Sequence, residues 1–188
     1  MNAVFTPKPT RIDTERYQKM VAAGVLNKYD RIELIEGEML DMAPIGSQHA
    51  ALTARLNRML VLGTQNLAAV FPGGPINLGD FSEPQPDLLV LRPRADDYSA
   101  QLPTGADALL IVEVSDSTLA FDQGVKLSLY ARFGIPEYWV VDVASKGIVV
   151  YREPADNGYR NSLRYTIGDT VSPLALPQVV ISVRELFG

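Results

Sequence analysis

The chain has 188 residues, no cysteine and a formal net charge of −5, and 47% of its residues are hydrophobic. These values suit one globular domain that buries its core without disulfides, and they exclude a thiolate zinc site and a cysteine nucleophile. No apolar run approaches the ~20 residues of a membrane span, and the first residues lack the apolar core of a signal peptide, so we expect a cytoplasmic protein with no membrane partner. The acidic net charge argues against a protein whose main function is to bind nucleic acid, but it does not exclude a nuclease.

The N-terminal part predicts an arm, a helix and a hairpin. Residues 1–12 have the composition of a loose arm, and Thr14 is a capping residue for a helix that ends near residue 23. Polar and apolar residues alternate over 31–42 on either side of Glu36-Gly37, which is typical of a hairpin. We therefore expect residues 14–45 to form an N-terminal helix and hairpin.

Residues 46–142 hold the predicted core of the domain, which begins with a helix. Ser47 can cap this helix and Gly63 can end it. Residues 68–78 predict a strand, and the segment Pro72-Gly-Gly-Pro75 bends it or ends it early. One stripe of the helix, at spacings of three and four residues, predicts its inward face: His49, Leu52, Leu56, Met59 and Leu60.

Two short buried strands come next. Residues 87–91 follow a stiff, proline-containing lead-in over 83–86, and residues 108–114 follow a polar loop over 92–107. The second run is apolar almost throughout, which indicates a strand buried on both faces.

A helix over 119–133 and a strand over 135–142 complete the core, and residues 147–187 predict C-terminal strands that end in a helical turn over 183–187. The order helix, three strands, helix, strand predicts a mixed α/β layered domain with an α+β character. Two stripes run along the second helix. The predicted core stripe contains Phe121, Val125, Leu129 and Phe133, and the stripe beside it contains Asp122, Lys126 and Tyr130.

Three charged residues lie at the ends of these core elements. Asp87 opens one strand, Glu113 lies near the end of the next, and Lys126 is on the helix that follows. Two carboxylates on neighbouring strands can share a hard divalent cation, Mg²⁺ or Mn²⁺. Such a cation polarises a phosphoryl oxygen, and a nearby lysine can orient the attacking water. The three residues are therefore a minimal set for phosphodiester hydrolysis.

Pro86-Asp87 followed by Glu113-Val-Ser115 resembles the PD-(D/E)xK signature of restriction-endonuclease-like nucleases. More closely, the chain resembles a large family of uncharacterised bacterial restriction endonucleases over roughly residues 14–187. The matching segments are Glu33-Leu-Ile-Glu-Gly-Glu38, Met42-Ala-Pro44, His49, Gln85-Pro-Asp-Leu-Leu-Val90, Val112-Glu-Val-Ser115, Asp122-Gln-Gly-Val-Lys126-Leu-Ser-Leu-Tyr-Ala131 and Gly134-Ile-Pro-Glu-Tyr-Trp-Val-Val-Asp142.

The chain departs from the signature at one position. The signature lysine should follow the acidic residue by two positions, where this chain has Ser115. The resemblance implies that the lysine has moved to the helix as Lys126. A long, flexible side chain can reach the same place from a neighbouring element.

Each candidate residue also has a purely structural interpretation. Asp87 would be a turn residue after proline, Glu113 and Lys126 would form an ion pair without a metal, and Lys126 alone would pair with Asp122 on the helix surface. Glu38 is either a further metal or water ligand or an exposed hairpin charge. His49 is either a core histidine or a residue at the edge of the site.

The functional hypothesis is a single restriction-endonuclease-like domain that cleaves phosphodiester bonds in DNA. In it, Asp87 and Glu113 bind Mg²⁺ or Mn²⁺, Lys126 orients the attacking water, and Glu38 and His49 support them. By analogy, we also expect a homodimer, because a two-fold pair of active sites suits the cleavage of both strands of a DNA duplex. The alternatives are an inactive relative that binds nucleic acid or a protein, and a hydrolase of small phosphate esters.

Overall fold

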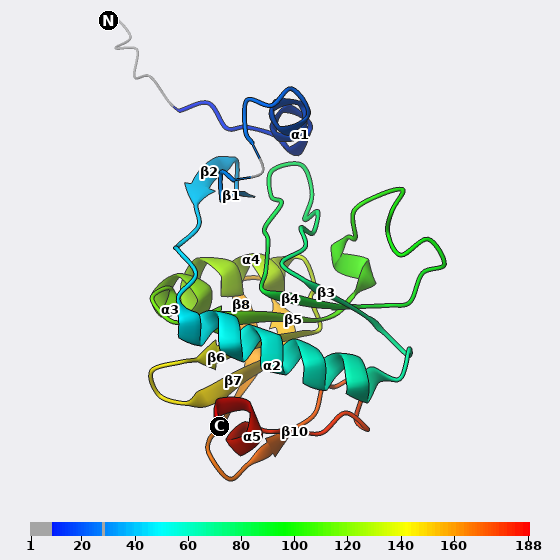
Figure 1. Cartoon of the computed structure of the whole chain (residues 1–188). Coiled ribbons are helices and arrows are strands. Elements are labelled where there is room, and N and C mark those ends of the chain that lie inside the picture. The colour runs from blue at the N-terminus through cyan, green and yellow to red at the C-terminus, as the bar shows by residue number, and fades with distance from the viewer. Residues whose placement is uncertain (1–8, 28) are drawn as a thin grey trace, which may run out of the picture.

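The computed structural model describes residues 9–27 and 29–188, so most of the predicted arm lies outside the described residues. Its centre is a six-stranded sheet with the strand order β3-β4-β5-β6-β7-β8 (Figure 1). β5 and β6 are parallel and the other neighbours are antiparallel. The strands are β3 (Ala69–Pro72), β4 (Leu88–Leu91), β5 (Ala108–Ser115), β6 (Glu137–Asp142), β7 (Gly147–Ala155) and β8 (Gly158–Tyr165).

The remaining elements pack around this sheet. The helices are α1 (Thr14–Ala22), α2 (Ser47–Thr64), α3 (Leu119–Phe121), α4 (Leu127–Arg132) and α5 (Val183–Phe187), with a 3₁₀ turn η1 (Gly105–Asp107) and a π turn η2 (Asp122–Lys126). The short strands are β1 (Ile32–Ile35), β2 (Glu38–Asp41), β9 (Thr170–Val171) and β10 (Ile181–Ser182). Within the described ranges no helix is both long and apolar enough to cross a membrane.

The sheet separates two hydrophobic cores. Leu88 and Val90 of β4 face α2 and the C-terminal segment, whereas Leu89 and Leu91 face α4, as the two-residue period of a strand requires. All eight residues of β5 are buried, so this strand is covered on both faces. The predicted mixed α/β fold and its order of helix, three strands, helix, strand are confirmed.

Several predicted boundaries were wrong because a neighbouring residue takes the capping role. Asp13, not Thr14, caps α1, and its carboxylate accepts from the backbone N–H of Arg16. Gly46 precedes α2 in place of Ser47, and Gly63 lies inside this helix rather than ending it. The strand predicted over 68–78 is confined to β3. The C-terminal strands predicted within residues 147–187 are β7, β8, β9 and β10, and the pairing of β9 with β10 was not predicted.

The helix after β5 presents only part of the predicted face to the sheet: Leu129 is buried as expected and Phe121 packs against the same core. Val125 and Phe133, expected in its core stripe, are 44% and 41% exposed. Asp122, Lys126 and Tyr130 are buried instead. In a regular α-helix residues four apart are offset by about 40°. Because the bonds of the π turn η2 span five residues, rotation per residue is smaller there, and this brings the three polar side chains onto one inward line.

The N-terminal hairpin is held against the segment that leads into β4. Its turn residues Glu36 and Gly37 both have positive φ, 52° and 85°, as in the tight turns that match strand twist. The backbones of Leu34 and Glu83 exchange hydrogen bonds, and Gly37 N–H donates to the carbonyl of Phe81. Docking of β1 therefore buries Glu33, which is only 4% exposed.

Glu83, at this junction, makes the stability of the hairpin unit depend on pH. Burial raises the pKa of its carboxyl above the ordinary 4.5, although Gln18 donates a hydrogen bond to it. The folded protein therefore holds the proton more tightly, and the free energy of unfolding should fall as pH rises from 4.5 through the raised value.

We predict that Glu83→Gln removes this dependence, so its stability relative to the unchanged protein increases as pH rises from 4 to 8. Urea denaturation across this range measures the difference. Glu38→Gln, a change to an exposed side chain, is the control. A Glu83→Gln difference that stays constant with pH would contradict the assignment.

Candidate active site

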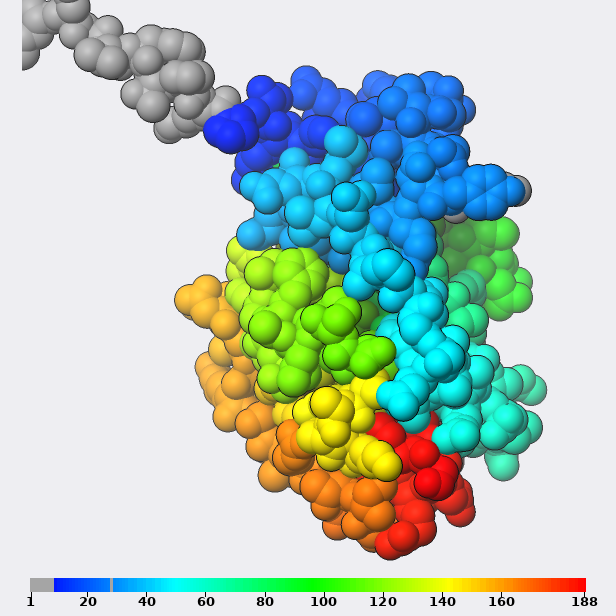
Figure 2. All heavy atoms as spheres, turned by 60° about the vertical axis from the view of Figure 1, so that its left-hand side comes forward, coloured from blue at the N-terminus to red at the C-terminus, as the bar shows by residue number. Residues whose placement is uncertain are grey.

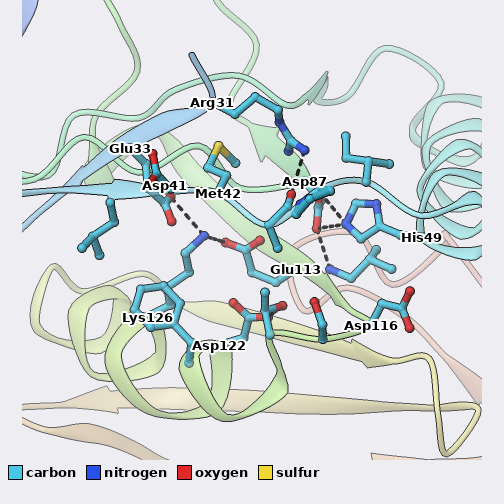
Figure 3. A pocket seen from close by; sticks show the side chains of 18 residues that line it. Arg31, Glu33, Asp41, Met42, His49, Asp87, Glu113, Asp116, Asp122 and Lys126 are labelled. Carbon is cyan, nitrogen blue, oxygen red and sulfur yellow. Dashed lines mark hydrogen bonds and ion pairs between the residues drawn. The ribbon is translucent and has the colours of Figure 1, made fainter. Parts of the chain in front are cut away.

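A cleft of about 530 Å³ opens between the hairpin, the start of α2 and the α3–η2 segment. Figure 2 shows this face, with the light-blue hairpin above the lime-green α3–η2 segment. Figure 3 shows how the polar side chains gather inside. The charged and titratable residues that line the cleft are Arg31, Glu33, Asp41, His49, Asp87, Glu113, Asp116, Asp122 and Lys126.

The pairing of β4 with β5 explains why Asp87 and Glu113 meet. These strands are antiparallel, and Leu88 lies opposite Val112. The next positions along the two strands are Asp87 and Glu113, so the register brings both carboxylates to one place. Both residues line the cleft.

Two neighbours fix the carboxylate of Asp87. The backbone N–H of Val114 donates to Oδ2 at 2.8 Å, and Nε2 of His49 lies 3.0 Å from each carboxylate oxygen. The hydrogen bond to Asp87 is the main cause that raises the pKa of His49, against the opposing effect of burial. The Asp87 side chain is still 18% exposed, so it remains accessible from the cleft.

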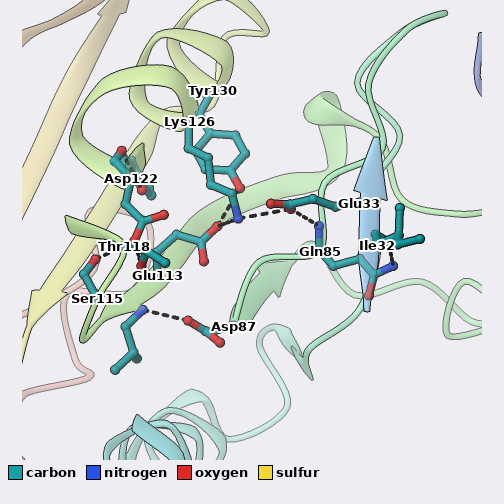
Figure 4. A network of polar contacts seen from close by, with 12 residues as sticks. Ile32, Glu33, Gln85, Asp87, Glu113, Ser115, Thr118, Asp122, Lys126 and Tyr130 are labelled. Atoms are coloured by element: carbon teal, nitrogen blue, oxygen red, sulfur yellow. Dashed lines mark hydrogen bonds and ion pairs between the residues drawn. The ribbon is translucent and has the colours of Figure 1, made fainter. Parts of the chain in front are cut away.

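Glu113 is buried in a polar network (Figure 4). Its Oε1 accepts from the Lys126 ammonium at 3.0 Å and from the Tyr130 hydroxyl at 2.8 Å. Burial raises the pKa of Glu113 well above its usual value, and Lys126 opposes this rise. The network therefore holds one carboxylate oxygen in place between two donors.

Lys126 lies between two carboxylates. Its ammonium is 3.1 Å from Oε2 of Glu33 and 3.0 Å from Oε1 of Glu113, and the side chain is only 5% exposed. Burial alone would lower the pKa of Lys126, but Glu113, Glu33 and Asp122 outweigh it and raise the pKa above the ordinary value. The neighbouring carboxylates therefore favour the charged ammonium form of Lys126.

Ser115, at the position of the signature lysine, has a different task. Its hydroxyl donates to Oδ2 of Asp122 at 2.7 Å, and Thr118 donates to the same oxygen at 2.5 Å. These bonds fasten the π turn to the end of β5. The π turn directs Lys126 into the cleft. A lysine on the helix can therefore approach the carboxylate of Glu113.

The cleft brings together four of the five residues that the sequence suggested: Asp87, Glu113, Lys126 and His49. The fifth, Glu38, is exposed on β2 and is not among the residues that line the cleft.

Glu33 is the residue that the sequence reasoning missed. Its position in a matching segment was a signal, but alternation within a hairpin does not reveal which face another element will cover. Here the backbone N–H of Gln85 also donates to Oε2 of Glu33, so the same docking that buries this carboxylate directs it at Lys126.

The donor set suits a hard cation bound through few protein ligands. Among the residues that the structure describes, no group of three or more His, Cys, Asp or Glu side chains is arranged to hold a metal ion. Mg²⁺ needs only one or two carboxylates, because waters and substrate oxygens complete its shell. Asp87 and Glu113 fit that requirement, whereas a structural zinc site would need four ligands.

The strand order and the helical layers define a restriction-endonuclease-like α/β protein. The family model for Uma2, described as "Putative restriction endonuclease", matches residues 14–184, so the chain belongs to this family. A solved structure described as a putative nuclease belonging to DUF820, from Anabaena variabilis ATCC 29413, has a TM-score of 0.72 to this chain. The match covers 94% of this chain and 97% of the other at 16% identity, which shows the shared fold. No protein of curated function matches the sequence.

We predict that Lys126→Met lowers the free energy of unfolding at pH 7 by about 3–5 kcal/mol, because it leaves two buried carboxylates without their shared cation. The loss should shrink at pH 5, where carboxyl groups take up protons more readily. Denaturant unfolding at both pH values measures it. Lys19→Met removes an exposed lysine that pairs with Glu15 and should change stability little. Equal effects of the two substitutions would show that Lys126 is not the centre of the network.

Proposed function

We propose that the protein is a divalent-metal-dependent endonuclease that hydrolyses phosphodiester bonds in DNA. The observation that carries the proposal is the convergence of Asp87, Glu113 and the Lys126 ammonium in one cleft, with 3.0 Å between the ammonium and Oε1 of Glu113. Membership of a family described as restriction endonucleases supports the same reaction class.

Asp87 and Glu113 would hold Mg²⁺ or Mn²⁺. When bound, such an ion supplies a Lewis acid and makes a water molecule more acidic. The partners of the two carboxylates keep them oriented: His49 and the Val114 N–H for Asp87, and Tyr130 for Glu113. Orientation of this kind reduces the rearrangement needed as the reaction proceeds.

Lys126 would orient the attacking water and stabilise negative charge that develops on the phosphate. It is suited to this task because its three N–H donors carry a fixed positive charge. Glu33 holds the ammonium from the hairpin side, and Glu113 holds it from the sheet. We assign His49 and Glu33 to positioning, and we leave Glu38 outside the proposed site because it does not line the cleft.

A hydrolase of small phosphate esters is the second candidate. The observation that favours it is the size of the cleft, about 530 Å³, which is in the range of small-molecule pockets. Comparing the cleavage of plasmid DNA, RNA and nucleotides distinguishes the two enzymes. An inactive nucleic-acid- or protein-binding relative would bind no divalent cation at Asp87 and Glu113. The homodimer and the cytoplasmic location stay predictions.

We predict that Asp87→Asn and Glu113→Gln each reduce Mn²⁺-dependent cleavage of DNA, plasmid or single-stranded, by at least about a hundredfold, because each removes one of two metal-binding carboxylates. Cleavage assays measure the loss, and circular dichroism checks that both variants fold. Glu38→Gln, outside the cleft, should retain activity. Full activity in a folded Asp87→Asn or Glu113→Gln protein would refute the mechanism.

A further inference from the structure

Beside its carboxylates, the cleft has an apolar wall. This wall consists of Leu40, Met42, Pro44, Ile45, Val114 and Phe121. Ile45 is 54% exposed, although it is a large apolar residue. Figure 3 shows Met42 above Glu113 and close to Arg31, so the apolar wall and the charged groups belong to one cavity. Apolar walls with a few polar groups are typical of sites that enclose a ligand of matching chemistry.

The charge of the cleft is poorly suited to binding DNA through its phosphates alone. Six of the residues that line it are carboxylates, and its permanently cationic residues, among those that the structure describes, are Arg31 and Lys126. The ammonium of Lys126 already contacts Glu33 and Glu113, and Arg31 donates to the carbonyl of Ala43. A duplex-binding protein commonly neutralises about 6–10 phosphates with lysine and arginine. Phosphate contacts alone therefore cannot hold DNA in this cleft, so a bound strand also needs contacts to its bases.

We propose that the cleft binds single-stranded DNA, with the base next to the scissile phosphate packed against the apolar wall. This inference rests on the proposed nuclease function, because that function places a phosphate beside Asp87 and Glu113. One sugar joins each base to its phosphate, so a phosphate at that position puts its base within reach of the apolar wall. A volume of about 530 Å³ accommodates a nucleotide rather than a stacked duplex.

A single strand can place a base in the cavity more easily than a duplex can. In a duplex, the base has to be unpaired and unstacked before it can enter such a pocket, whereas in a single strand it is free to turn outward. Phe121 offers an aromatic ring, and its centroid lies 5.9 Å from the Lys126 ammonium. Stacking on an aromatic side chain is the usual sequence-tolerant contact for single-stranded bases. A single strand also needs only one active site, so this reaction does not require a dimer.

The test measures binding separately from cleavage. Fluorescence anisotropy, with Ca²⁺ in place of Mg²⁺, gives the Kd of the full chain for a labelled 12-mer DNA strand and for the same strand annealed to its complement. We expect at least tenfold tighter binding of the single strand. Ile45→Ala and Phe121→Ala should each weaken its binding by about three- to tenfold. Leu62→Ala, which changes a 71% exposed residue on α2 outside the cleft, is the matched control.

Two outcomes overturn the inference: duplex binding as tight as single-strand binding, and single-strand affinity unchanged in both Ile45→Ala and Phe121→Ala. Because Ile45 is exposed, its substitution leaves the core intact, and the test does not depend on the partly buried Phe121. Absence of binding to either DNA also overturns it. Single-strand binding without cleavage in Mg²⁺ or Mn²⁺ would support the binding mode and refute the nuclease function.

Discussion

The shared ion pair of Lys126 with Glu33 and Glu113 is the interaction on which the site depends. Three elements of the chain meet in it: the hairpin through Glu33, the sheet through Glu113 and the helical segment through Lys126. All three side chains are almost completely buried, and removing one member of such a group leaves an uncompensated charge in a medium that solvates it poorly. The position of the hairpin and the geometry of the cleft are therefore linked.

Two backbone features make this arrangement possible. The antiparallel register of β4 and β5 brings Asp87 beside Glu113, and the π turn η2 directs Lys126 inward. Ser115 and Thr118 hold that turn through hydrogen bonds to Asp122. Ser115, which occupies the position of the signature lysine, thus supports Lys126, the lysine that replaces it. π turns inside helices occur frequently at functional sites, and here the turn changes which face of the helix meets the sheet.

Much of this arrangement could be predicted from the sequence, because β4, β5 and β6 are short apolar runs with clear boundaries, and Asp87, Glu113 and Lys126 lie at their ends or on the helix between them. The inward face of that helix was predicted only in part. Leu129 is buried as expected, but a regular period of 3.6 residues also places Val125 and Phe133 in the core, and nothing in the local pattern shows a π turn. Glu33 was missed for another reason: its partner is distant in sequence, and only the docking of the hairpin on residues 81–85 buries it. The predicted N-cap of α1 was wrong by one residue, because Asp13 and Thr14 are both good capping residues and the sequence alone does not show which of them is used.

The central claim is that Asp87 and Glu113 together hold a divalent cation beside Lys126. A crystal of the protein soaked in Mn²⁺ tests it most directly, because the anomalous scattering of manganese locates the ion without reference to activity. The account predicts an anomalous peak within about 2.0–2.5 Å of carboxylate oxygens of both Asp87 and Glu113, and no such peak in Asp87→Asn crystals. A manganese peak elsewhere in the cleft, or a site that survives Asp87→Asn, would contradict it.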